Sequence, residues 1–339
     1  MLDRIPATFL FAAAASLSPT FFAPGFFAAG HAAQGADDLR TRSYRCEFPL
    51  VEPRVFAGTR ISTGDYETHL ALSPEGKAAF FVKSTYQYDH WTILQAQFKG
   101  GKWDPPEVAP FSGLDSDADP FLTADGSKLY FISDRPVPDK PGKDLDIWWV
   151  EKLAQEWSAA YHLDGPVNGA GSDEWFPCVV ASGTLYFGSD RPGGSGKTDI
   201  WRAKLVDGRY GEPENLGAPV NSAADEYECL VSPDERYLVL MAAGRPGELG
   251  QGDLYLSVNE GGRWSEPKLL GNSINSPDIE LGPALSPDGR YFFFSSTRRR
   301  TLAPRKVPMN AADLGIRLNT SGNGFGDIYQ VDVTSLEIP

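Results

Sequence analysis

Short apolar runs recur along the chain and alternate with turn-forming residues. Five segments share one pattern: ETHLALSPEGKAAFFV from Glu67, DADPFLTADGSKLYFISDRP from Asp117, EWFPCVVASGTLYFGSDRP from Glu174, EYECLVSPDERYLVL from Glu226, and ELGPALSPDGRYFFFSS from Glu280. Each has an acidic residue, a short apolar stretch, a turn and a second, aromatic stretch. Pro, Asp and Gly in turns such as SPDG fix the backbone angles of a tight reversal. The pattern therefore predicts five β-hairpins.

Each hairpin is followed by material for two further strands. A third strand opens with an aspartate and an aromatic residue, as in DIW from Asp199 and DLY from Asp253, and a fourth follows a Gly-rich turn, as at residues 264–270. The first acids of successive units lie 50 to 57 positions apart, a spacing that suits a four-stranded propeller blade. We therefore predict an all-β, five-bladed β-propeller of four-stranded antiparallel blades over residues 48–335, with blades starting near residues 65, 117, 173, 225 and 278.

The last unit ends after its third strand, and the missing strand is found near the N-terminus. Residues 51–58 resemble residues 265–271, which form the fourth strand of the preceding unit. An N-terminal strand that completes the last blade would close the ring and remove two exposed sheet edges. Closure of the ring in this way predicts that residues 48–335 form a single domain.

The repeat resembles a known family. The motifs SPDG from Ser286, SDRPGG from Ser189 and GDIY from Gly326, together with E-x-x-P from Glu174 and Glu280, are similar to the WD40-like (PD40) repeat of TolB-type propellers. The resemblance covers nearly all of the chain after residue 48 and implies the propeller fold. Such repeats occur in binding scaffolds and in the propeller lids of peptidases, so the fold alone assigns no activity.

Composition adds a location and restricts the partners. An apolar, Ala/Phe-rich run follows Arg4, and residues 1–33 are expected to be a signal peptide, with residues 34–47 an N-terminal extension and the protein periplasmic or secreted. The net charge of −14 disfavours nucleic acid and anionic membranes as general partners. Cys46, Cys178 and Cys229 have no metal-binding spacing, and the last two are expected in the core.

Recurrent charged residues are predicted to meet on one face of the propeller, because strand direction alternates within each blade. An acidic ring is formed by Glu67, Asp117, Glu174, Glu226 and Glu280. Arg135, Arg191, Arg245 and Arg298 follow the second strands, and Asp146, Asp199, Asp253 and Asp327 open the third strands. Acid and arginine recur together, which favours a structural brace between blades. The alternative is a charged channel mouth that binds a hard cation such as Ca²⁺.

Blade one departs from this repeat. Tyr86 stands where other blades have arginine, and Thr92 stands where they have aspartate. Departures from a repeat often mark function. One hypothesis is a ligand pocket that is lined by Glu67, His69, Tyr86, Tyr88, His90 and Trp91. The alternative is a degenerate blade whose loop packs on its neighbour.

The last blade contains a long insertion from Arg298 to Gly324, which holds the basic residues Arg299, Arg300, Arg305 and Lys306. It could dock an anionic partner or envelope polymer, but charged loops of this length are more often solvated.

The sequence lacks a nucleophile elbow, an H-E-x-x-H motif and a P-loop. We therefore expect an exported, monomeric, non-catalytic scaffold that binds a protein or a cell-envelope polymer, with no cofactor, no nucleic acid and no membrane span. The alternative is a carbohydrate-active enzyme, a glycosidase or polysaccharide lyase, that uses carboxylates at the channel mouth. Asp119 and Glu228 supply second carboxylates on the first strands of blades two and four.

Overall fold

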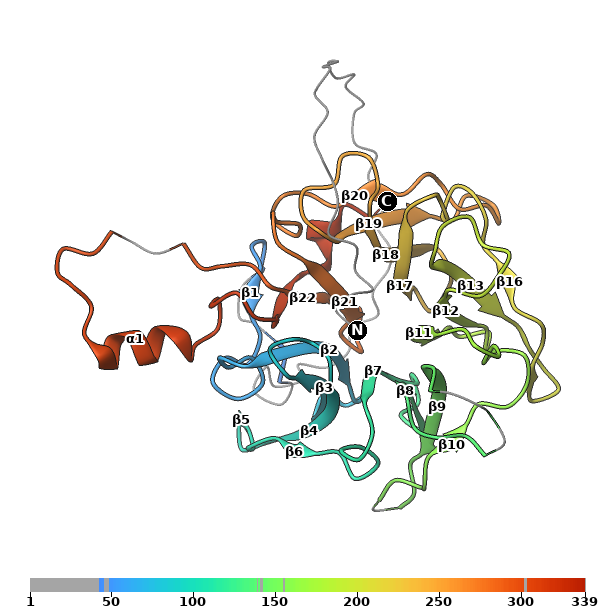
Figure 1. Cartoon of the computed structure of the whole chain (residues 1–339), viewed down its shortest axis with the longest axis horizontal. Coiled ribbons are helices and arrows are strands. Elements are labelled where there is room, and N and C mark those ends of the chain that lie inside the picture. Colours follow the sequence, from blue (N-terminus) through green and yellow to red (C-terminus); the bar gives the residue numbers. More distant parts are fainter. Residues whose placement is uncertain are drawn as a thin grey trace, which may run out of the picture.

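The chain forms a five-bladed β-propeller, in which five antiparallel sheets of four strands are arranged around a central axis (Figure 1). The computed structural model describes residues 43–45, 49–138, 140, 143–154, 156–301 and 304–338. The predicted signal peptide and most of the N-terminal extension, including Cys46, lie outside these residues. Cys178 and Cys229 are buried, as expected.

The blades follow one another along the chain. Blade one contains β2 (Tyr66–Leu72), β3 (Ala78–Ser84), β4 (Trp91–Lys99) and β6 (Glu107–Val108), with β5 (Lys102–Trp103) paired to the end of β4. Blade two contains β7 (Asp117–Leu122), β8 (Lys128–Ser133), β9 (Asp146–Glu151) and β10 (Tyr161–His162). Blade three contains β11 (Glu174–Val179), β12 (Leu185–Ser189), β13 (Asp199–Ala203) and β16 (Glu214–Asn215), and the small hairpin of β14 (Leu205–Val206) and β15 (Arg209–Tyr210) projects from it. Blade four contains β17 (Asp225–Val231), β18 (Tyr237–Ala243), β19 (Asp253–Val258) and β20 (Lys268–Leu269).

Blade five joins the two ends of the chain. It contains β21 (Glu280–Leu285), β22 (Tyr291–Ser296), β23 (Asp327–Asp332) and the N-terminal β1 (Arg54–Val55). Arg54 and Val55 pair antiparallel with Gln330 and Tyr329, so the predicted closing strand is confirmed. Helix α1 (Ala311–Leu318) lies between β22 and β23, and a 3-10 helix (Val333–Leu336) follows β23.

Apolar side chains of the inner and middle strands fill the space between neighbouring blades. The second strands are almost wholly buried, and Phe131, Phe187 and Phe292 are inaccessible to solvent. Burial of such rings is the main favourable term for a fold of this kind. Among the described residues, no helix is long and apolar enough to cross a membrane.

The innermost strands β2, β7, β11, β17 and β21 surround the axis (Figure 1). The pairing of each with its second strand shifts register near its start. His69, Asp119, Phe176 and Gly282 adopt positive φ at this shift. Such β-bulges re-aim a side chain, and in these four blades the residue with positive φ lies two positions after the ring acid.

Candidate functional site

The five ring acids are buried, and their carboxylates are engaged by protein groups. All have zero exposure. Four form ion pairs with arginine: Asp117 with Arg135, Glu174 with Arg191, Glu226 with Arg245 and Glu280 with Arg298. The same guanidinium groups donate to backbone carbonyls that lead into each blade, those of Phe111, Val167, Val220 and Ile274. The acids therefore do not line an open charged funnel. Each acid and its arginine belong to one blade, and the arginine ties that blade to the segment that arrives from the preceding blade.

Glu67 is held differently. Its carboxylate accepts hydrogen bonds from the Thr63 amide at 2.9 Å and from the Thr63 hydroxyl at 2.5 Å. The Lys83 ammonium lies 3.3 Å away, in place of the arginine of the other blades. Blade one thus keeps a brace of different chemistry.

The aspartates that open the third strands act mainly as backbone acceptors. Asp199 accepts from the amides of Ser195 and Gly196, and Asp327 accepts from the Gly322 amide at 2.6 Å. Asp253 accepts from two amides in the same way. Asp146 instead binds the Lys140 ammonium at 2.6 Å and the His162 ring at 2.9 Å. These residues organise the loops between the second and third strands.

A hydrogen-bonded network, which we call the axial network, occupies the centre of the propeller. It comprises Thr68, His69, Tyr88, Asp119 and Glu228. His69 Nε2 lies 3.0 Å from Glu228 Oε1 and 3.2 Å from Asp119 Oδ1. His69 Nδ1 lies 2.8 Å from the Thr68 hydroxyl, which also bonds to Tyr88. Blades one and four are not neighbours in the ring, so the contact between His69 and Glu228 crosses the axis.

The axial network ties all five blades together. Asp119 of blade two accepts from the Phe176 amide of blade three at 3.0 Å. Glu228 of blade four accepts from the Gly282 amide of blade five at 2.6 Å. The His69 amide donates to the Ser295 hydroxyl of blade five at 3.0 Å. Gly282 has φ of 61°, and a Cβ there would lie 3.2 Å from His69, so this position favours glycine.

Burial and charge control the protonation of the network. Burial raises the pKa of Asp119 to about 6, against the opposing effect of His69. Burial lowers the pKa of His69, but Asp119 and Glu228 outweigh it and raise that pKa above its ordinary value. The imidazole is thus favoured in its charged form between the two carboxyl groups. Burial also raises the pKa of the Tyr88 hydroxyl, which remains protonated and able to donate.

Aromatic rings gather beside this network, at the end of the axis where the first and third strands begin. We call this set the aromatic cluster: Tyr66, Tyr88, Trp91, Trp175, Tyr227 and Phe325. Ring centroids of Tyr66 and Tyr88 are 4.8 Å apart, and those of Trp91 and Trp175 are 6.4 Å apart. Trp91 belongs to blade one and Trp175 to blade three, so this contact also spans non-adjacent blades.

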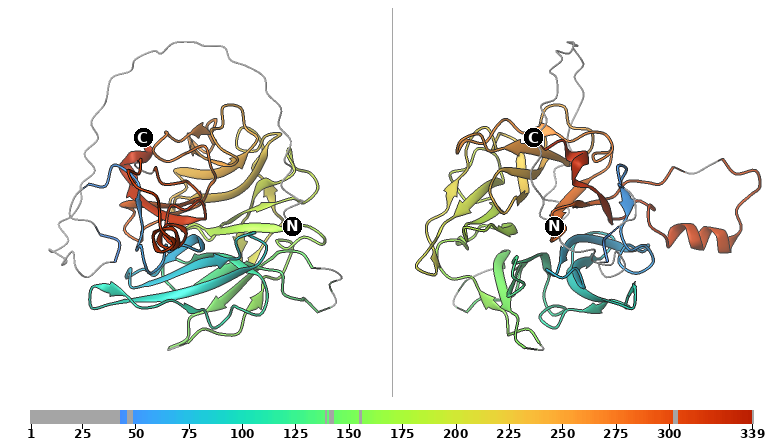
Figure 2. Two further views of the ribbon diagram at one scale, coloured as in Figure 1. Left: turned by 60° about the vertical axis from the view of Figure 1, so that its left-hand side comes forward. Right: turned by 180° about the vertical axis from the view of Figure 1, so that it is seen from behind.

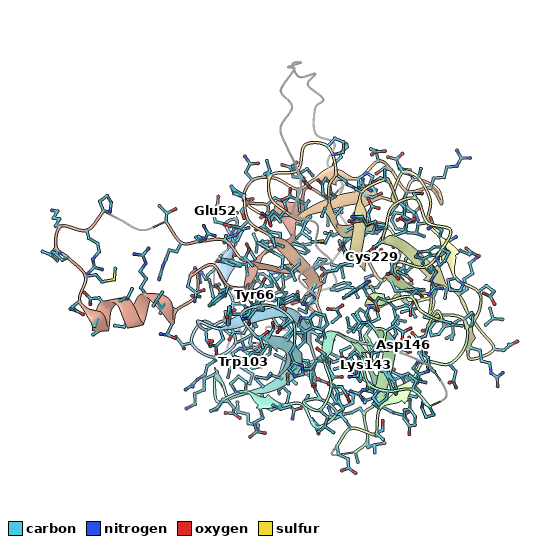
Figure 3. All side chains as sticks on the ribbon, in the orientation of Figure 1. Glu52, Tyr66, Trp103, Lys143, Asp146 and Cys229 are labelled. Carbon is cyan, nitrogen blue, oxygen red and sulfur yellow. The ribbon has the colours of Figure 1, made fainter. Side chains whose placement is uncertain are left out.

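The aromatic cluster is partly open to solvent. Trp91 is buried, whereas the other five members are partly exposed. Tyr66 lies on the side of blade one that faces the strands of blade five (Figure 3). Trp91 Nε1 is buried and has no hydrogen-bond partner among the described residues. The cluster therefore presents ring surface to solvent, whereas the Trp91 donor lies beneath it.

The pocket predicted from blade one is brought together only in part. Tyr88 and Trp91 lie in the aromatic cluster, and His69 lies below them in the axial network. Tyr86 is 69% exposed and His90 is also exposed, whereas Glu67 is enclosed by Thr63 and Lys83. The six residues therefore do not line a single pocket.

Several residues of the site were not found by sequence reasoning. Thr68, Trp175 and Tyr227 were missed, and each follows a ring acid by one position; His69, Asp119 and Glu228, which the sequence did single out, follow one by two positions. Aligning the five units at the ring acid could have shown both positions. The sequence gives no sign that His69 touches Glu228, 159 positions away.

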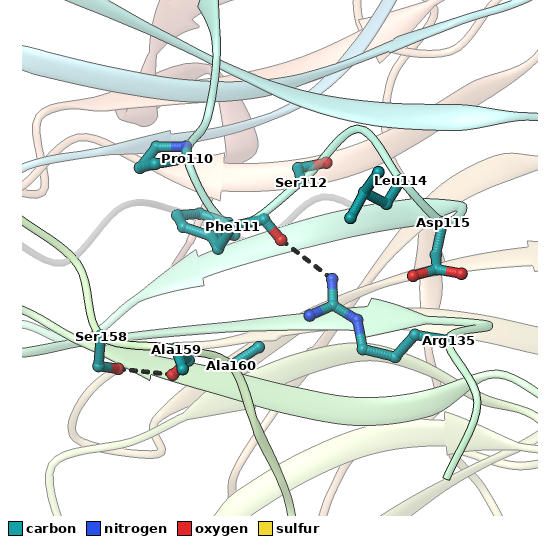
Figure 4. A pocket seen from close by; sticks show the side chains of 9 residues that line it. All are labelled: Pro110, Phe111, Ser112, Leu114, Asp115, Arg135, Ser158, Ala159 and Ala160. Carbon is teal, nitrogen blue, oxygen red and sulfur yellow. Dashed lines mark hydrogen bonds between the residues drawn. The ribbon is translucent and has the colours of Figure 1, made fainter.

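A separate small pocket of about 200 Å³ lies between blades one and two, away from the axial network (Figure 4). Phe111, Leu114 and Asp115 line one side, and Arg135 and Ser158 line the other. The Arg135 guanidinium donates to the Phe111 carbonyl at 3.0 Å and pairs with Asp117. The guanidinium group of this pocket is thus already used by the brace.

No metal centre is assigned. Within the described part of the chain, no group of three or more His, Cys, Asp or Glu side chains is arranged to hold a metal ion. The Ca²⁺ hypothesis for the acidic ring therefore gains no support from the geometry.

Comparison with known proteins identifies no family. No family model and no curated protein sequence matches the chain. Solved structures that resemble it include the α-L-arabinofuranosidase PaAbf62A from Podospora anserina, with 12% identity over 86% of this chain and 97% of that one and a TM-score of 0.46. A puromycin-hydrolysing peptidase from Mycobacterium tuberculosis has 17% identity over 78% of this chain and a TM-score of 0.41. This chain spans 42% of the length of that peptidase. At such values the likeness assigns no activity.

Proposed function

We propose that the propeller binds a saccharide chain of the cell envelope at the aromatic cluster. The observation that carries this proposal is the gathering of partly exposed rings from blades one, three, four and five at one end of the axis. Flat aromatic faces stack on the apolar faces of sugar rings, while a few polar groups fix the orientation of the ligand.

The charge of the chain supports a neutral or amino-bearing saccharide over an acidic one. The chain carries a net charge of −14, and Asp119 and Glu228 lie next to the cluster with only one imidazole between them. A ligand with further carboxylates would be repelled. The proposal includes export, which would bring the protein to envelope polymers, and membership of the TolB-type repeat family.

The test is calorimetric titration with a panel of neutral and amino oligosaccharides. Trp175→Ala and Tyr227→Ala should each weaken binding about tenfold, the factor that corresponds to 1.4 kcal/mol, because each removes a stacking face. Tyr161→Ala is the matched control, since Tyr161 is an exposed ring on the outer strand of blade two. Equal affinity in all three variants, or no binding by the wild-type protein, would contradict the proposal.

A second candidate is cleavage of the bound saccharide. It is favoured by the pKa of Asp119, which is raised to about 6, close to the value that a general acid needs. Access is the argument against it. Asp119 and Glu228 are 6% and 8% exposed and both are bonded to His69, so that a glycosidic oxygen would have to displace the imidazole.

Cleavage is tested by incubating the protein with any oligosaccharide that it binds and analysing the products by mass spectrometry. Binding without cleavage is the expected result. Turnover that is lost in Asp119→Asn and Glu228→Gln, with binding retained, would instead establish an enzyme.

A further inference from the structure

The insertion of blade five forms an arm that projects from the propeller. Its base is a narrow neck, where Arg299 pairs with Asn323 and the Arg300 amide donates to the Gly322 carbonyl at 3.0 Å. Beyond the neck the chain extends sideways and carries helix α1 (Figures 1 and 2). No residue of α1 is buried. An isolated helix of eight residues is marginal in water, so a surface that packs against it would stabilise it.

Large apolar side chains are concentrated on the arm. Val307, Leu314, Ile316 and Leu318 are 67%, 46%, 66% and 57% exposed. At 100° per residue, Leu314 and Leu318 lie on one side of α1 and Ile316 lies on another, with Ala311, Ala312 and Gly315 between them. The remaining side carries Asp313 and Arg317. The apolar surface is therefore wider than the narrow stripe that a helix presents to a protein groove.

The arm is also basic within an acidic chain. It carries Arg299, Arg300, Arg305, Lys306 and Arg317, with Asp313 as its one acidic residue. Asp313 binds Arg305 at 2.8 Å. Lys306 and Arg317 are exposed, and Arg299 is 77% exposed with its nearest acid, Asp278, at 3.9 Å. Within the described part of the chain, Lys306 and Arg317 form no ion pair, so the arm carries positive charge that is not neutralised locally.

We infer that the arm docks on the surface of a lipid bilayer that contains anionic lipids. Exposed Leu, Ile and Val side chains enter the boundary between headgroups and acyl chains, and arginine and lysine bind the anionic headgroups. The wide apolar arc of α1 suits a helix that lies in this interface. The acidic propeller is repelled by the same surface, which confines the contact to the arm.

The experiment is cosedimentation of the full chain with two kinds of vesicle, pure phosphatidylcholine and phosphatidylcholine mixed with phosphatidylglycerol. The wild-type protein should bind the mixed vesicles, and added salt should weaken this binding. Removing two cations in Lys306→Ser/Arg317→Ser should weaken it about 30-fold. Leu314→Ser/Ile316→Ser should weaken binding to a similar degree by removing apolar contact.

The matched control is Leu205→Ser/Val206→Ser, which changes two exposed apolar residues of the β14 hairpin and should leave vesicle binding unchanged. All substituted residues are exposed, and thermal unfolding verifies that each variant folds. Absence of wild-type binding to the mixed vesicles would overturn the inference, and so would equal binding by the arm variants. Sedimentation velocity tests whether the arm instead joins two copies of the chain. A dimer that the arm variants dissociate, without vesicle binding, would assign the arm to a second copy of the chain and overturn the lipid inference.

Discussion

His69→Ala is expected to destabilise the propeller by about 3–5 kcal/mol, the cost of breaking a buried ion pair from one side. The imidazole is 3% exposed and lies within 3.2 Å of both Asp119 and Glu228. Its removal leaves two buried carboxyl groups without a cation and breaks the link from blade one to blades two and four. Urea unfolding at pH 7 measures the loss.

His90→Ala is the control, because His90 is on the same blade but exposed, and its free energy of unfolding should remain within about 0.5 kcal/mol of the wild-type value. Adding Asp119→Asn to His69→Ala should restore part of the lost stability, since one buried charge is then removed. If His69→Ala unfolded at the same urea concentration as His90→Ala, the axial network would not contribute to stability.

The fold could be predicted because its signals are local and repeated. Each hairpin carries its own turn, and the similarity of residues 51–58 to residues 265–271 indicated the closing strand, which pairs with Tyr329 and Gln330. The repeat also made the acid and arginine pairs visible, since a brace that serves one blade serves its neighbours. Only the partner of the ring acid in blade one could not be predicted from the repeat. The structure shows Lys83 in the place of the arginine.

The site was less predictable because it depends on where blades meet across the axis. His69 was recognised as unusual, but its grouping with Tyr86 and His90 assumed that residues close in sequence share a pocket. The β-bulge turns His69 toward Asp119 and Glu228, while Tyr86 and His90 remain on an exposed loop. A strand pattern in sequence does not show a bulge of this kind, because one residue with positive φ leaves the alternation of apolar residues nearly unchanged.

The free energy of unfolding is expected to fall as pH rises from about 4 to 7. Burial raises the pKa of Asp119 to about 6 and that of Asp327 to about 7, whereas an unfolded chain has aspartate pKa values near 3.9. Asp327 accepts one amide hydrogen bond, and its Oδ1 has no partner among the described residues. In this pH range the folded state therefore binds more protons than the unfolded state.

The direction in which the free energy of unfolding changes with pH follows from this difference in bound protons. A group whose pKa is higher in the folded protein than in the unfolded chain stabilises the fold fully below the unfolded pKa, and this stabilisation is lost as pH rises through the folded pKa. The loss therefore begins near pH 4. It extends through pH 6 for Asp119 and through pH 7 for Asp327. Each group contributes on the order of 3 kcal/mol. The raised pKa of His69 acts in the same direction at higher pH. Asp125, whose pKa is lowered to about 2, titrates below this range.

Urea unfolding at intervals between pH 4 and 8 measures the slope, and Asp327→Asn identifies its source. The amide still accepts the Gly322 hydrogen bond but does not ionise, so this variant should be the more stable protein at pH 7 and should lose less stability between pH 4 and 7. Asp125→Asn is the control, because the pKa of Asp125 is lowered to about 2 by hydrogen bonds from Thr123 and Ser127; it should keep the wild-type slope between pH 4 and 7. Stability that rises with pH, or an unchanged slope in Asp327→Asn, would contradict the prediction. Either result would show that these buried carboxyl groups ionise in the folded protein at little cost in free energy.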